Sequence, residues 1–384
     1  MSWADLSLIK PFSTQDAHYM SQAIRLAERG QLTVRPNPAV GCVIVKDDQV
    51  VGEGWHIRAG TPHAEVHALR MAGEQSQGAT AYVTLEPCSH HGRTPPCCDA
   101  LTAAGVARVV VAMQDPNPLV AGKGIARLRG AGIQVDVGLM EASARALNVG
   151  FLSRMERGLP FVRAKVGASL DGKTALLNGQ SQWITSEAAR ADVQQLRARS
   201  GAIVTGVDTL LADNPKLTVR LAGFESFQPL RVVLDTHLRS PLNAELFQCA
   251  GDLLILTSQD ALTQQAEKVS LFKQQGVGVL AVALDDSGRL NLVDVMRLLA
   301  ETFTINDVLI EAGANLTASA IASGVVDELW WYTSGALMGE ARSALAGMPA
   351  LTSMQQVNQW RLLEQRRIGH DLRSRWLPPL AVNS

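Results

Sequence analysis

The chain reads T-P-H-A-E-V-H-A-L over residues 61–69 and T-L-E-P-C-S-H-H-G-R-T-P-P-C-C over residues 84–98. These segments supply one imidazole, His63, and two thiols, Cys88 and Cys97. Three such ligands leave the fourth tetrahedral position of a zinc ion to water, whereas structural zinc sites are closed by four ligands. The ion lowers the pKa of its water from about 15.7 to about 7. The two segments therefore predict a hydrolytic zinc site.

Glu65 follows His63 closely enough to share the first turn of one helix with it. A helix is expected there because a threonine-proline pair precedes an apolar helical pattern. The Glu65 carboxylate could then take a proton from the water and pass it to a ring nitrogen and to a leaving amine. A second helix is predicted to begin after residues 95–96, a double proline. Together the segments match the H-x-E…P-C…C signature of zinc-dependent nucleobase deaminases.

The spacing of the cysteines departs from the common C-x-x-C pattern, because S-H-H-G-R-T-P-P separates them. This leaves Cys98, His90 and His91 as rival ligands. Cys97 is preferred because it follows the double proline directly, whereas Cys98 would point about 100° away around the helix. If Cys98 or His90 completed a fourth ligand, the site would instead be a closed structural zinc module in a scaffold protein, and no water would be activated.

The composition limits the classes of protein. A chain of 384 residues predicts two domains. Lys and Arg total 35 against 36 Asp and Glu, which argues against a nucleic-acid partner. Five cysteines, an odd number, fit metal binding in a reducing compartment better than a disulfide framework. No apolar run approaches a membrane span, and we expect a soluble, cytoplasmic protein with no membrane partner. Residues 1–12 are expected to form a loose leader.

The first half alternates helices and strands. A helix is predicted over residues 13–30, with Ser13 as N-cap, then strands over 40–46 and 50–55. After the His63 helix come strand 80–85, helix 96–104, strand 108–113, helix 124–130 and strand 133–137. This order indicates an α/β layer structure with the site at strand C-termini. Asn37, between two prolines, either binds a pyrimidinone edge or is an ordinary turn residue.

A domain boundary is predicted within residues 147–160, where the composition changes. Beyond it we expect a strand that turns at Asp171-Gly172, and a helix over residues 187–199 capped by Thr185 or Ser186. Further strands are predicted over 202–205, 231–235, 253–257, 278–282 and 307–310, with a helix near 292–300. The E-A-G-A segment at Glu311 either binds phosphate at a helix start or is an ordinary turn. The arginines near the C-terminus are expected on a solvated face of the final strands.

Six segments occur in an order that resembles the bifunctional deaminase/reductases of riboflavin biosynthesis. They are R-P-N-P-A-V-G-C-V-I-V, H-A-E-V-H-A-L, T-L-E-P-C-S-H-H-G-R-T-P-P-C, K-V-G-A-S-L-D-G-K-T-A, S-Q-W-I-T-S and L-L-A-D-N-P-K-L-T-V-R. The resemblance extends from about Asp16 to the final strands, and this family shares the long cysteine spacing. It implies an α/β protein: a cytidine-deaminase-like α/β/α sandwich over residues 13–150 and a dihydrofolate-reductase-like α/β domain over residues 160–380.

The resemblance also implies the two reactions. The first domain would use Zn²⁺ to deaminate 2,5-diamino-6-(5-phosphoribosylamino)pyrimidin-4(3H)-one hydrolytically. The second would use NADPH to reduce 5-amino-6-(5-phosphoribosylamino)uracil to the ribitylamino product. The partner is then a small-molecule phosphoribosylaminopyrimidine rather than nucleic acid, and a homo-oligomer is the expected assembly. An alternative is a deaminase of free or RNA bases whose second half is only a binding module.

The resemblance assigns roles residue by residue. The zinc ligands would be His63, Cys88 and Cys97, with Glu65 as proton shuttle. Substrate contacts are expected at Asn37, from its own chemistry, and, from the resemblance, at Ser181, Arg197, Leu217, Arg220 and Glu311. NADPH contacts are expected at Gly167, Trp183, Thr209, Asp213, Gly313, Ala314, Asn315, Leu316, Thr317, Ala318 and Ser319. Arg197 and Arg220 suit bidentate binding of a ribose phosphate, or are solvated surface arginines. Lys165 and Asp213 could assist proton delivery to the opened sugar.

Overall fold

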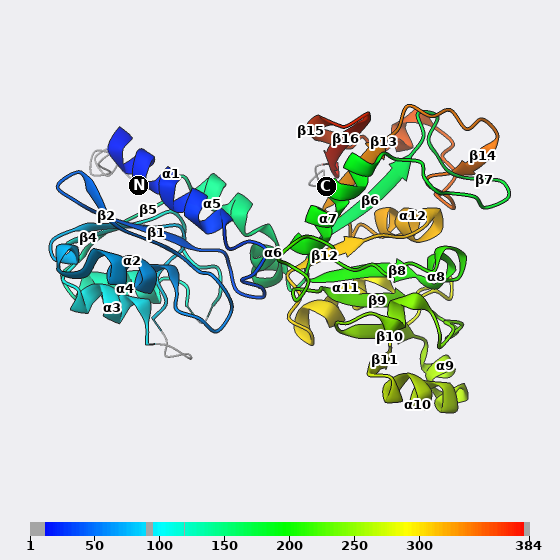
Figure 1. Ribbon diagram of the computed structural model, residues 1–384, viewed down its shortest axis with the longest axis horizontal. Helices are drawn as coiled ribbons and strands as arrows, with labels where there is room; N and C mark the ends of the chain where they lie inside the picture. Colours follow the sequence, from blue (N-terminus) through cyan, green and yellow to red (C-terminus); the bar gives the residue numbers. More distant parts are fainter. Residues whose placement is uncertain (1–11, 90–94, 119, 380–384) are drawn as a thin grey trace. The chain divides into compact units, whose positions relative to one another are not determined.

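The computed structural model describes residues 12–89, 95–118 and 120–379. The chain divides into two compact units, with the break between Arg157 and Gly158 (Figure 1). Residues 1–11 of the predicted leader and the rival ligands His90 and His91 lie outside the described residues. Within those residues, no helix combines the length and apolar character needed to cross a membrane.

The first unit contains a five-stranded sheet in the order β2-β1-β3-β4-β5. Its strands are β1 (Gly41–Lys46), β2 (Gln49–Trp55), β3 (Thr80–Val83), β4 (Arg108–Val111) and β5 (Gln134–Val137). β1 pairs antiparallel with β2 and β3, whereas β3, β4 and β5 are parallel. The C-terminal ends of β3 and β4 therefore lie at the same edge of the sheet.

Helices cover both faces of this sheet, because successive residues of β1 point to opposite sides. Cys42 and Ile44 belong to one apolar core with α2 (Ala64–Ala72), α3 (Cys97–Ala103) and α4 (Lys123–Gly130). Val43 and Val45 belong to the other, with α1 (Thr14–Glu28), α5 (Glu141–Leu147) and α6 (Val149–Arg157). This unit is thus an α/β/α sandwich. Helices α5 and α6 were not predicted from the sequence.

The start of α1 confirms the predicted cap. The Ser13 hydroxyl accepts a hydrogen bond from the Asp16 backbone N–H at 3.0 Å, and the Asp16 carboxylate accepts one from the Ser13 N–H at 2.9 Å. The same carboxylate binds the Tyr82 hydroxyl at 2.8 Å and the Arg108 guanidinium at 2.7 Å. Asp16 therefore ties the first helix to strands β3 and β4 as well as capping it.

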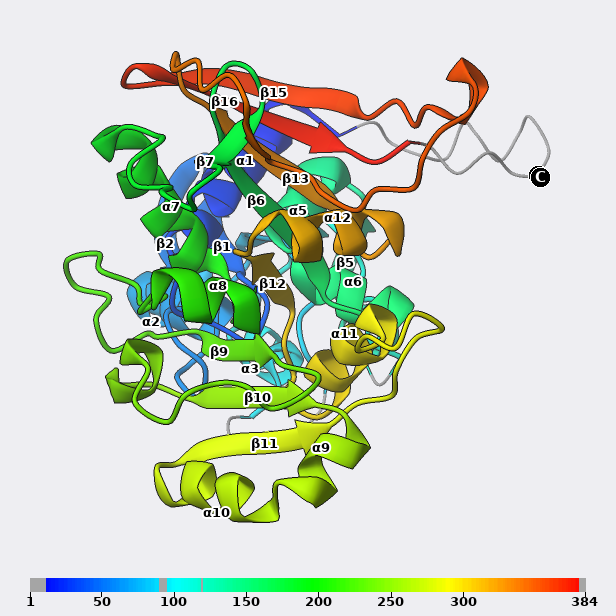
Figure 2. The same cartoon turned by 90° about the vertical axis from the view of Figure 1, so that its right-hand side faces the viewer.

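The second unit contains a nine-stranded sheet in the order β11-β10-β9-β8-β12-β6-β13-β16-β15 (Figure 2). Its strands are β6 (Phe161–Ala168), β8 (Ala202–Gly206), β9 (Leu230–Leu234), β10 (Leu253–Thr257), β11 (Val277–Ala281), β12 (Asp307–Ile310), β13 (Glu328–Thr333), β15 (Arg361–Ile368) and β16 (Asp371–Leu377). The strands from β11 to β13 are parallel, and β16 and β15 add an antiparallel hairpin. A separate two-stranded sheet pairs β7 (Lys173–Leu176) with β14 (Ala341–Ser343).

Helices lie on both faces of this larger sheet. One core contains side chains of α11 (Leu292–Glu301) and α12 (Ala314–Ala322). The other contains side chains of α7 (Glu187–Arg199), α8 (Val207–Asp213), α9 (Gln259–Gln264) and α10 (Ala266–Gln274). Of the two predicted caps for α7, Ser186 is the one used, because its hydroxyl accepts from the Ala189 N–H at 3.3 Å.

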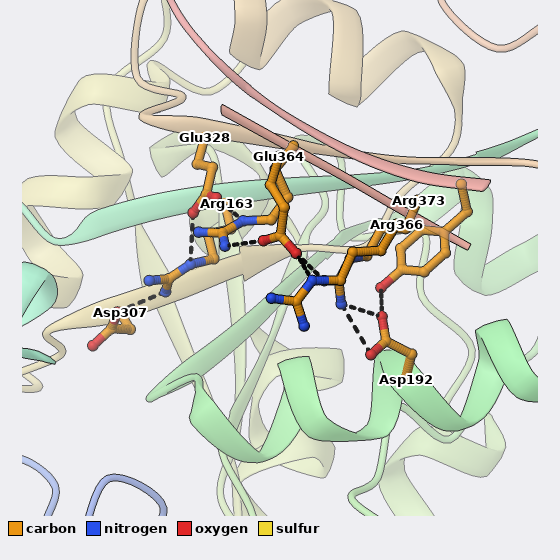
Figure 3. Close-up of polar contacts among 9 residues, drawn as sticks. Arg163, Asp192, Asp307, Glu328, Glu364, Arg366 and Arg373 are labelled. Carbon is orange, nitrogen blue, oxygen red and sulfur yellow. Dashed lines mark hydrogen bonds and ion pairs between the residues drawn. The ribbon is translucent and has the colours of Figure 1, made fainter. Parts of the chain in front are cut away.

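An ion-pair network connects the final hairpin to the sheet and to α7 (Figure 3). The Glu328 side chain is 2% exposed and binds both Arg163, at 3.2 Å, and Arg375, at 2.5 Å. Arg373, 9% exposed, binds Asp192 of α7 at 2.8 Å. The expectation of a solvated face is therefore wrong for Arg373 and Arg375. Alternate residues of a strand point to the same side, and on this side of β16 the carboxylates of Asp192, Glu328 and Glu364 compensate the charges of the two arginines.

Candidate active sites

The first site lies where β3 ends and helices α2 and α3 begin. His63 is the N-cap of α2, and Cys97 is the first residue of α3. The His63 Nδ1 atom lies 3.6 Å from Cys88 Sγ and 3.3 Å from Cys97 Sγ. One ligand atom from each of these three residues lies within 4.8 Å of the others. The structure thus brings the three predicted ligands together.

The donor set fits a zinc ion. One imidazole nitrogen and two sulfur atoms form the His/Cys/Cys set of catalytic zinc sites, which hold three protein ligands. The pKa of the Cys88 thiol is lowered, because the Cys97 thiol and the His63 ring donate hydrogen bonds to its sulfur. The Cys97 backbone N–H also donates to that sulfur, at 3.3 Å. These contacts favour the thiolate that a metal binds.

Glu65 lies on the first turn of α2, directly beside this cluster. Its side chain is buried, and the residue is 3% exposed. Burial raises the pKa of the Glu65 carboxyl, and the negative charge of Cys88 raises it further. A buried carboxyl group whose pKa is raised accepts a proton more readily than an exposed one. Glu65 thus lies beside the predicted ligands, and its role as proton shuttle stays a prediction.

Cys98, the described rival ligand, faces away from the other two sulfur atoms. Its thiol donates hydrogen bonds to the Pro87 carbonyl at 3.2 Å and to the Gly124 carbonyl at 3.5 Å. Both contacts turn the Cys98 sulfur towards backbone carbonyls of other segments and away from His63. Among the described residues, the metal-ligand cluster therefore has three members, as in an open catalytic site.

Asn37 is held by a histidine that sequence reasoning did not single out. Asn37 Nδ2 lies 3.1 Å from His56 Nε2, and His56 Nδ1 lies 3.3 Å from the Pro62 carbonyl oxygen. Because a carbonyl only accepts, Nδ1 carries the proton and Nε2 accepts from the asparagine. Burial lowers the pKa of His56, which is consistent with a neutral ring. The ring also packs edge-on against His63, with centroids 5.1 Å apart.

The second site is a pocket of about 1000 Å³ at the C-terminal ends of β6, β8 and β12. Ligands of parallel α/β sheets bind at this edge. The pocket is lined by most of the residues predicted to contact substrate or NADPH: Gly167, Ser181, Trp183, Arg197, Thr209, Asp213, Leu217, Arg220, Glu311, Gly313, Ala314, Asn315 and Leu316. Lys165 lines it as well. Thr317 and Ala318 are buried within α12, and Ser319 accepts a hydrogen bond from Arg289 at 3.2 Å.

Arg197 and Glu311 form a buried ion pair in this pocket. Their side chains are 12% and 7% exposed, and two guanidinium nitrogens reach the carboxylate at 2.6 and 3.0 Å. Arg197 Nη1 donates to the Thr218 carbonyl at 3.0 Å, and Lys165 Nζ lies 3.7 Å from Glu311. Burial alone would raise the pKa of Glu311, but the charges of Arg197 and Lys165 lower it. Arg197 therefore directs its donors at protein groups.

Arg220 has a different environment. Its side chain is exposed at the pocket. Its backbone N–H donates a hydrogen bond to Gln194 Oε1 at 2.9 Å. The guanidinium is thus available to an anionic ligand, unlike that of Arg197.

The start of α12 presents backbone N–H groups to the same pocket. Gly313 is the N-cap and supplies no side-chain acceptor. The Gly313 N–H itself donates to the Thr209 hydroxyl at 2.9 Å. The following N–H groups, with the positive end of the helix dipole, suit an anionic phosphate.

The exposed indole ring of Trp183 lines the same pocket. The Trp183 side chain is 70% exposed, and the Arg190 guanidinium lies 4.4 Å from its ring centroid. Arg190 also donates to the Thr185 carbonyl at 2.6 Å. Sequence reasoning did not single out Arg190. Its position seven residues, or two helical turns, before Arg197 was the signal that it would share the pocket face of α7.

Two family models match the chain. The cytidine and deoxycytidylate deaminase zinc-binding region matches residues 13–113, and the RibD C-terminal domain matches residues 160–373. Riboflavin biosynthesis protein RibD of Escherichia coli (strain K12) is 48% identical over 369 residues, which cover 93% of this chain and 98% of that protein. The Haemophilus influenzae protein of the same name is 42% identical and covers 96% and 98%.

Solved structures agree with these matches. Acinetobacter baumannii RibD (form 1) has a TM-score of 0.87 and 46% identity, over 95% of this chain and 99% of that chain. A diaminohydroxyphosphoribosylaminopyrimidine deaminase/5-amino-6-(5-phosphoribosylamino)uracil reductase from Thermotoga maritima has a TM-score of 0.83 and 32% identity, over 95% and 99%. These similarities confirm the predicted fold class, a cytidine-deaminase-like domain followed by a dihydrofolate-reductase-like domain.

Proposed function

Because the chain belongs to the RibD family of bifunctional deaminase/reductases, we propose that its two sites act in turn on one phosphoribosylaminopyrimidine. Its activity is the RibD deaminase/reductase activity of riboflavin biosynthesis. We assign one reaction to each unit because the His63/Cys88/Cys97 cluster lies in the first unit and the large pocket lies in the second. The first unit would deaminate 2,5-diamino-6-(5-phosphoribosylamino)pyrimidin-4(3H)-one, and the second would reduce the resulting uracil.

In the deaminase, His63, Cys88 and Cys97 hold the zinc ion. When bound, the ion supplies the Lewis acidity that allows a water molecule to lose a proton near neutral pH. Glu65 accepts that proton and delivers it to a ring nitrogen as the hydroxide adds to the ring carbon. It then carries the second proton, from the new hydroxyl group, to the amine, which leaves as ammonia while the ring carbon keeps the oxygen as a carbonyl. Asn37, oriented by His56, offers its amide to the edge of the pyrimidinone.

In the reductase, the pocket binds the opened sugar and the cofactor together. We assign NADPH to the α12 end, where the N–H groups after Gly313 would bind its phosphates and Trp183 would offer a ring face. When bound, NADPH supplies the hydride. Lys165, 3.7 Å from Glu311, is placed to deliver a proton to the opened sugar, and Ser181 and Asp213 lie together on the same wall, 3.4 Å apart.

Arg220 rather than Arg197 binds the ribose phosphate in this proposal. The Arg197 donors contact Glu311 and Thr218, whereas the Arg220 guanidinium is exposed at the pocket. Arg197 then acts as a positioning residue that keeps the Glu311 carboxylate ionised and correctly oriented. Leu217, buried beside these groups at a φ of 50°, fixes the turn that carries Arg220 into the pocket.

For the domain limits we keep residues 160–380 but extend the first domain from 150 to Arg157. Phe151 and Leu152 of α6 are buried in the core of the first unit, so a fragment that ends at residue 150 would expose that core. A homo-oligomer remains the predicted assembly, and sedimentation of the purified protein measures it.

Mass spectrometry of the pyrimidine, with and without NADPH, tests the two reactions. Without NADPH we expect only the replacement of an amino group by oxygen, and with NADPH also the addition of two hydrogens to the ribosyl group. NADH serves as the matched control for the choice of cofactor. Absence of the first mass change in zinc-loaded protein would contradict the deaminase, and absence of the second would contradict the reductase.

A further inference from the structure

Glu86 is a buried carboxylate that the proposed chemistry does not use. The residue is 4% exposed. Its Oε1 atom accepts hydrogen bonds from the backbone N–H groups of Gly124, at 2.8 Å, and Ile125, at 3.1 Å. Its Oε2 atom accepts from those of Gly122, at 2.9 Å, and Asp115, at 3.2 Å. Four backbone donors from distant segments thus converge on one side chain.

These contacts complete the start of helix α4. The N-cap of α4 is Gly122, which has a φ of 75° and no side chain with which to cap the helix. A carboxylate supplies about four lone-pair sites and is stabilised by the positive end of the helix dipole. Glu86 therefore serves as the missing cap, delivered from the end of β3 rather than from the chain preceding α4.

The same residue stands at the base of the turn that carries a zinc ligand. Glu86 is followed by Pro87 and Cys88. Gly124 packs so closely on this turn that an added Cβ would lie 2.1 Å from the Pro87 carbonyl oxygen. From the other side, the Cys98 thiol donates to that oxygen at 3.2 Å, and the Cys98 backbone N–H donates to the Cys88 carbonyl at 3.2 Å. The turn is held between α3 and α4.

We propose that Glu86 is a positioning residue of the metal centre, which fixes the Cys88 sulfur relative to His63 and Cys97 and thereby sets the affinity for zinc. This inference rests on the proposed zinc-dependent deaminase and names a residue on which its metal site depends. Residues that support metal ligands commonly change metal affinity about 10–100-fold when they are replaced. Here the support acts through the backbone of the turn, because Glu86 binds no ligand side chain directly.

Glu86→Gln is the decisive variant, made in the full-length protein. Glutamine keeps the size of the side chain but offers one acceptor oxygen and an NH₂ group, so two of the four backbone donors would meet a donor. Glu86→Asp keeps the charge and both oxygens on a shorter side chain. Glu53→Gln, at an exposed residue of β2 in the same unit, is the matched control.

Competition with a chromophoric chelator measures zinc affinity, and the visible spectrum of the Co²⁺-substituted protein reports the ligand geometry. We expect Glu86→Gln to weaken zinc binding about 10–100-fold and to shift the Co²⁺ bands. Glu86→Asp should recover part of both losses, and Glu53→Gln should match the wild-type protein. NADPH-dependent reduction of the deaminated pyrimidine should be unchanged in all three variants.

Wild-type zinc affinity and an unchanged Co²⁺ spectrum in Glu86→Gln would overturn the proposal, even if the melting temperature fell, because the residue would then be only structural. If Glu86→Gln does not fold, Glu86→Asp decides in the same way: wild-type affinity and spectrum overturn the proposal, and weaker binding supports it. Failure of the proposed deaminase is a separate outcome, since it would appear as zinc-loaded wild-type protein that leaves the pyrimidine amine in place.

Discussion

Replacement of Arg197 by methionine is expected to destabilise the second unit, whereas the same replacement of Arg220 is not. Both arginines line the same pocket. The Arg197 side chain is 12% exposed and pairs with Glu311, which is 7% exposed, whereas Arg220 is an exposed residue. Loss of Arg197 therefore leaves a buried carboxylate, and loss of Arg220 leaves no buried charge.

The size of the effect follows from what remains around Glu311. Removing one partner of a buried pair costs about 3–5 kcal/mol. Lys165 Nζ still lies 3.7 Å from the carboxylate, so we expect the lower end, about 3 kcal/mol, for Arg197→Met. With an m-value of about 2–3 kcal/mol/M in urea, the midpoint of unfolding falls by about 1 M. For Arg220→Met the free energy of unfolding should change by no more than about 0.5 kcal/mol.

The difference in stability between the wild-type protein and Arg197→Met should decrease as the pH falls. Burial would raise the pKa of Glu311, but Arg197 and Lys165 hold it below its usual value in the folded protein. A carboxyl group with a lowered folded pKa stabilises the fold above its unfolded pKa of about 4.3, and this contribution disappears as the pH falls through the folded value. The gap between wild type and Arg197→Met should therefore be full at pH 7 and shrink in acid.

Reductase kinetics distinguish the proposed phosphate-binding role of Arg220 from the proposed positioning role of Arg197. Arg220→Met removes a charge-assisted contact with the ribose phosphate, worth about 1.5–3 kcal/mol. Since about 1.4 kcal/mol corresponds to a factor of 10, KM for the pyrimidine should rise about 10–100-fold with little change in kcat. Arg197→Met should instead lower kcat, because Glu311 loses the partner that orients it. Urea unfolding and steady-state oxidation of NADPH measure both variants.

A double variant tests the cause. In Arg197→Met combined with Glu311→Gln, no buried charge remains unpaired, so stability should return while reductase activity stays low. If Arg197→Met unfolds at the wild-type midpoint and only raises KM, Arg197 is a free phosphate-binding cation and the reasoning from the ion pair is refuted.

Three further outcomes are expected. Glu65→Gln should retain zinc, by elemental analysis, but lose deamination by about 10²–10⁴-fold, because an amide cannot carry the proton; unchanged deamination contradicts its role. Glu328→Gln should lower the free energy of unfolding by about 1–3 kcal/mol, because Arg163 and Arg375 lose a shared buried partner but keep Asp307 and Glu364. Wild-type urea unfolding would show that the network adds no stability. Burial alone would raise the pKa of the Asp16 carboxyl, but hydrogen bonds from Arg108 and other groups hold it below its usual value. Asp16 therefore stabilises the fold above about pH 4, and this contribution is lost in acid. In Asp16→Asn the melting temperature should fall less between neutral and acidic pH than in the wild-type protein. An equal fall in both proteins contradicts this.

The fold was predictable where its signals are local. Ser13 and Asp16 lie in one capping box, and alternating strands and helices follow from hydrophobic pattern and from the prolines and glycines between them. The position of β12 between β8 and β6 depends on pairing between distant segments. Helix α6 was missed because the change in composition over residues 147–160 indicates a domain boundary, whereas Phe151 and Leu152 pack into the first core.

The candidate site residues could likewise be predicted where a short motif contains them. His63, Glu65, Cys88 and Cys97 come from short motifs in which the residue type states the chemistry. Arg197 and Arg220 look alike in the sequence, and only the tertiary neighbours show that one has a buried carboxylate partner and the other does not. The same limit applies to Arg373 and Arg375, whose partners Asp192 and Glu328 lie on other elements.

The long spacing between the cysteines has a physical explanation in these contacts. Cys97 is fixed as the first residue of α3, and Cys88 is fixed by the turn that Glu86 and Cys98 hold from either side. Each sulfur thus has contacts within its own element that position it. The length of that segment can therefore differ from the common C-x-x-C spacing while the ligand atoms still meet within 4.8 Å. It follows that substitutions at Glu86 should disturb the metal site more than changes in the length of the joining segment.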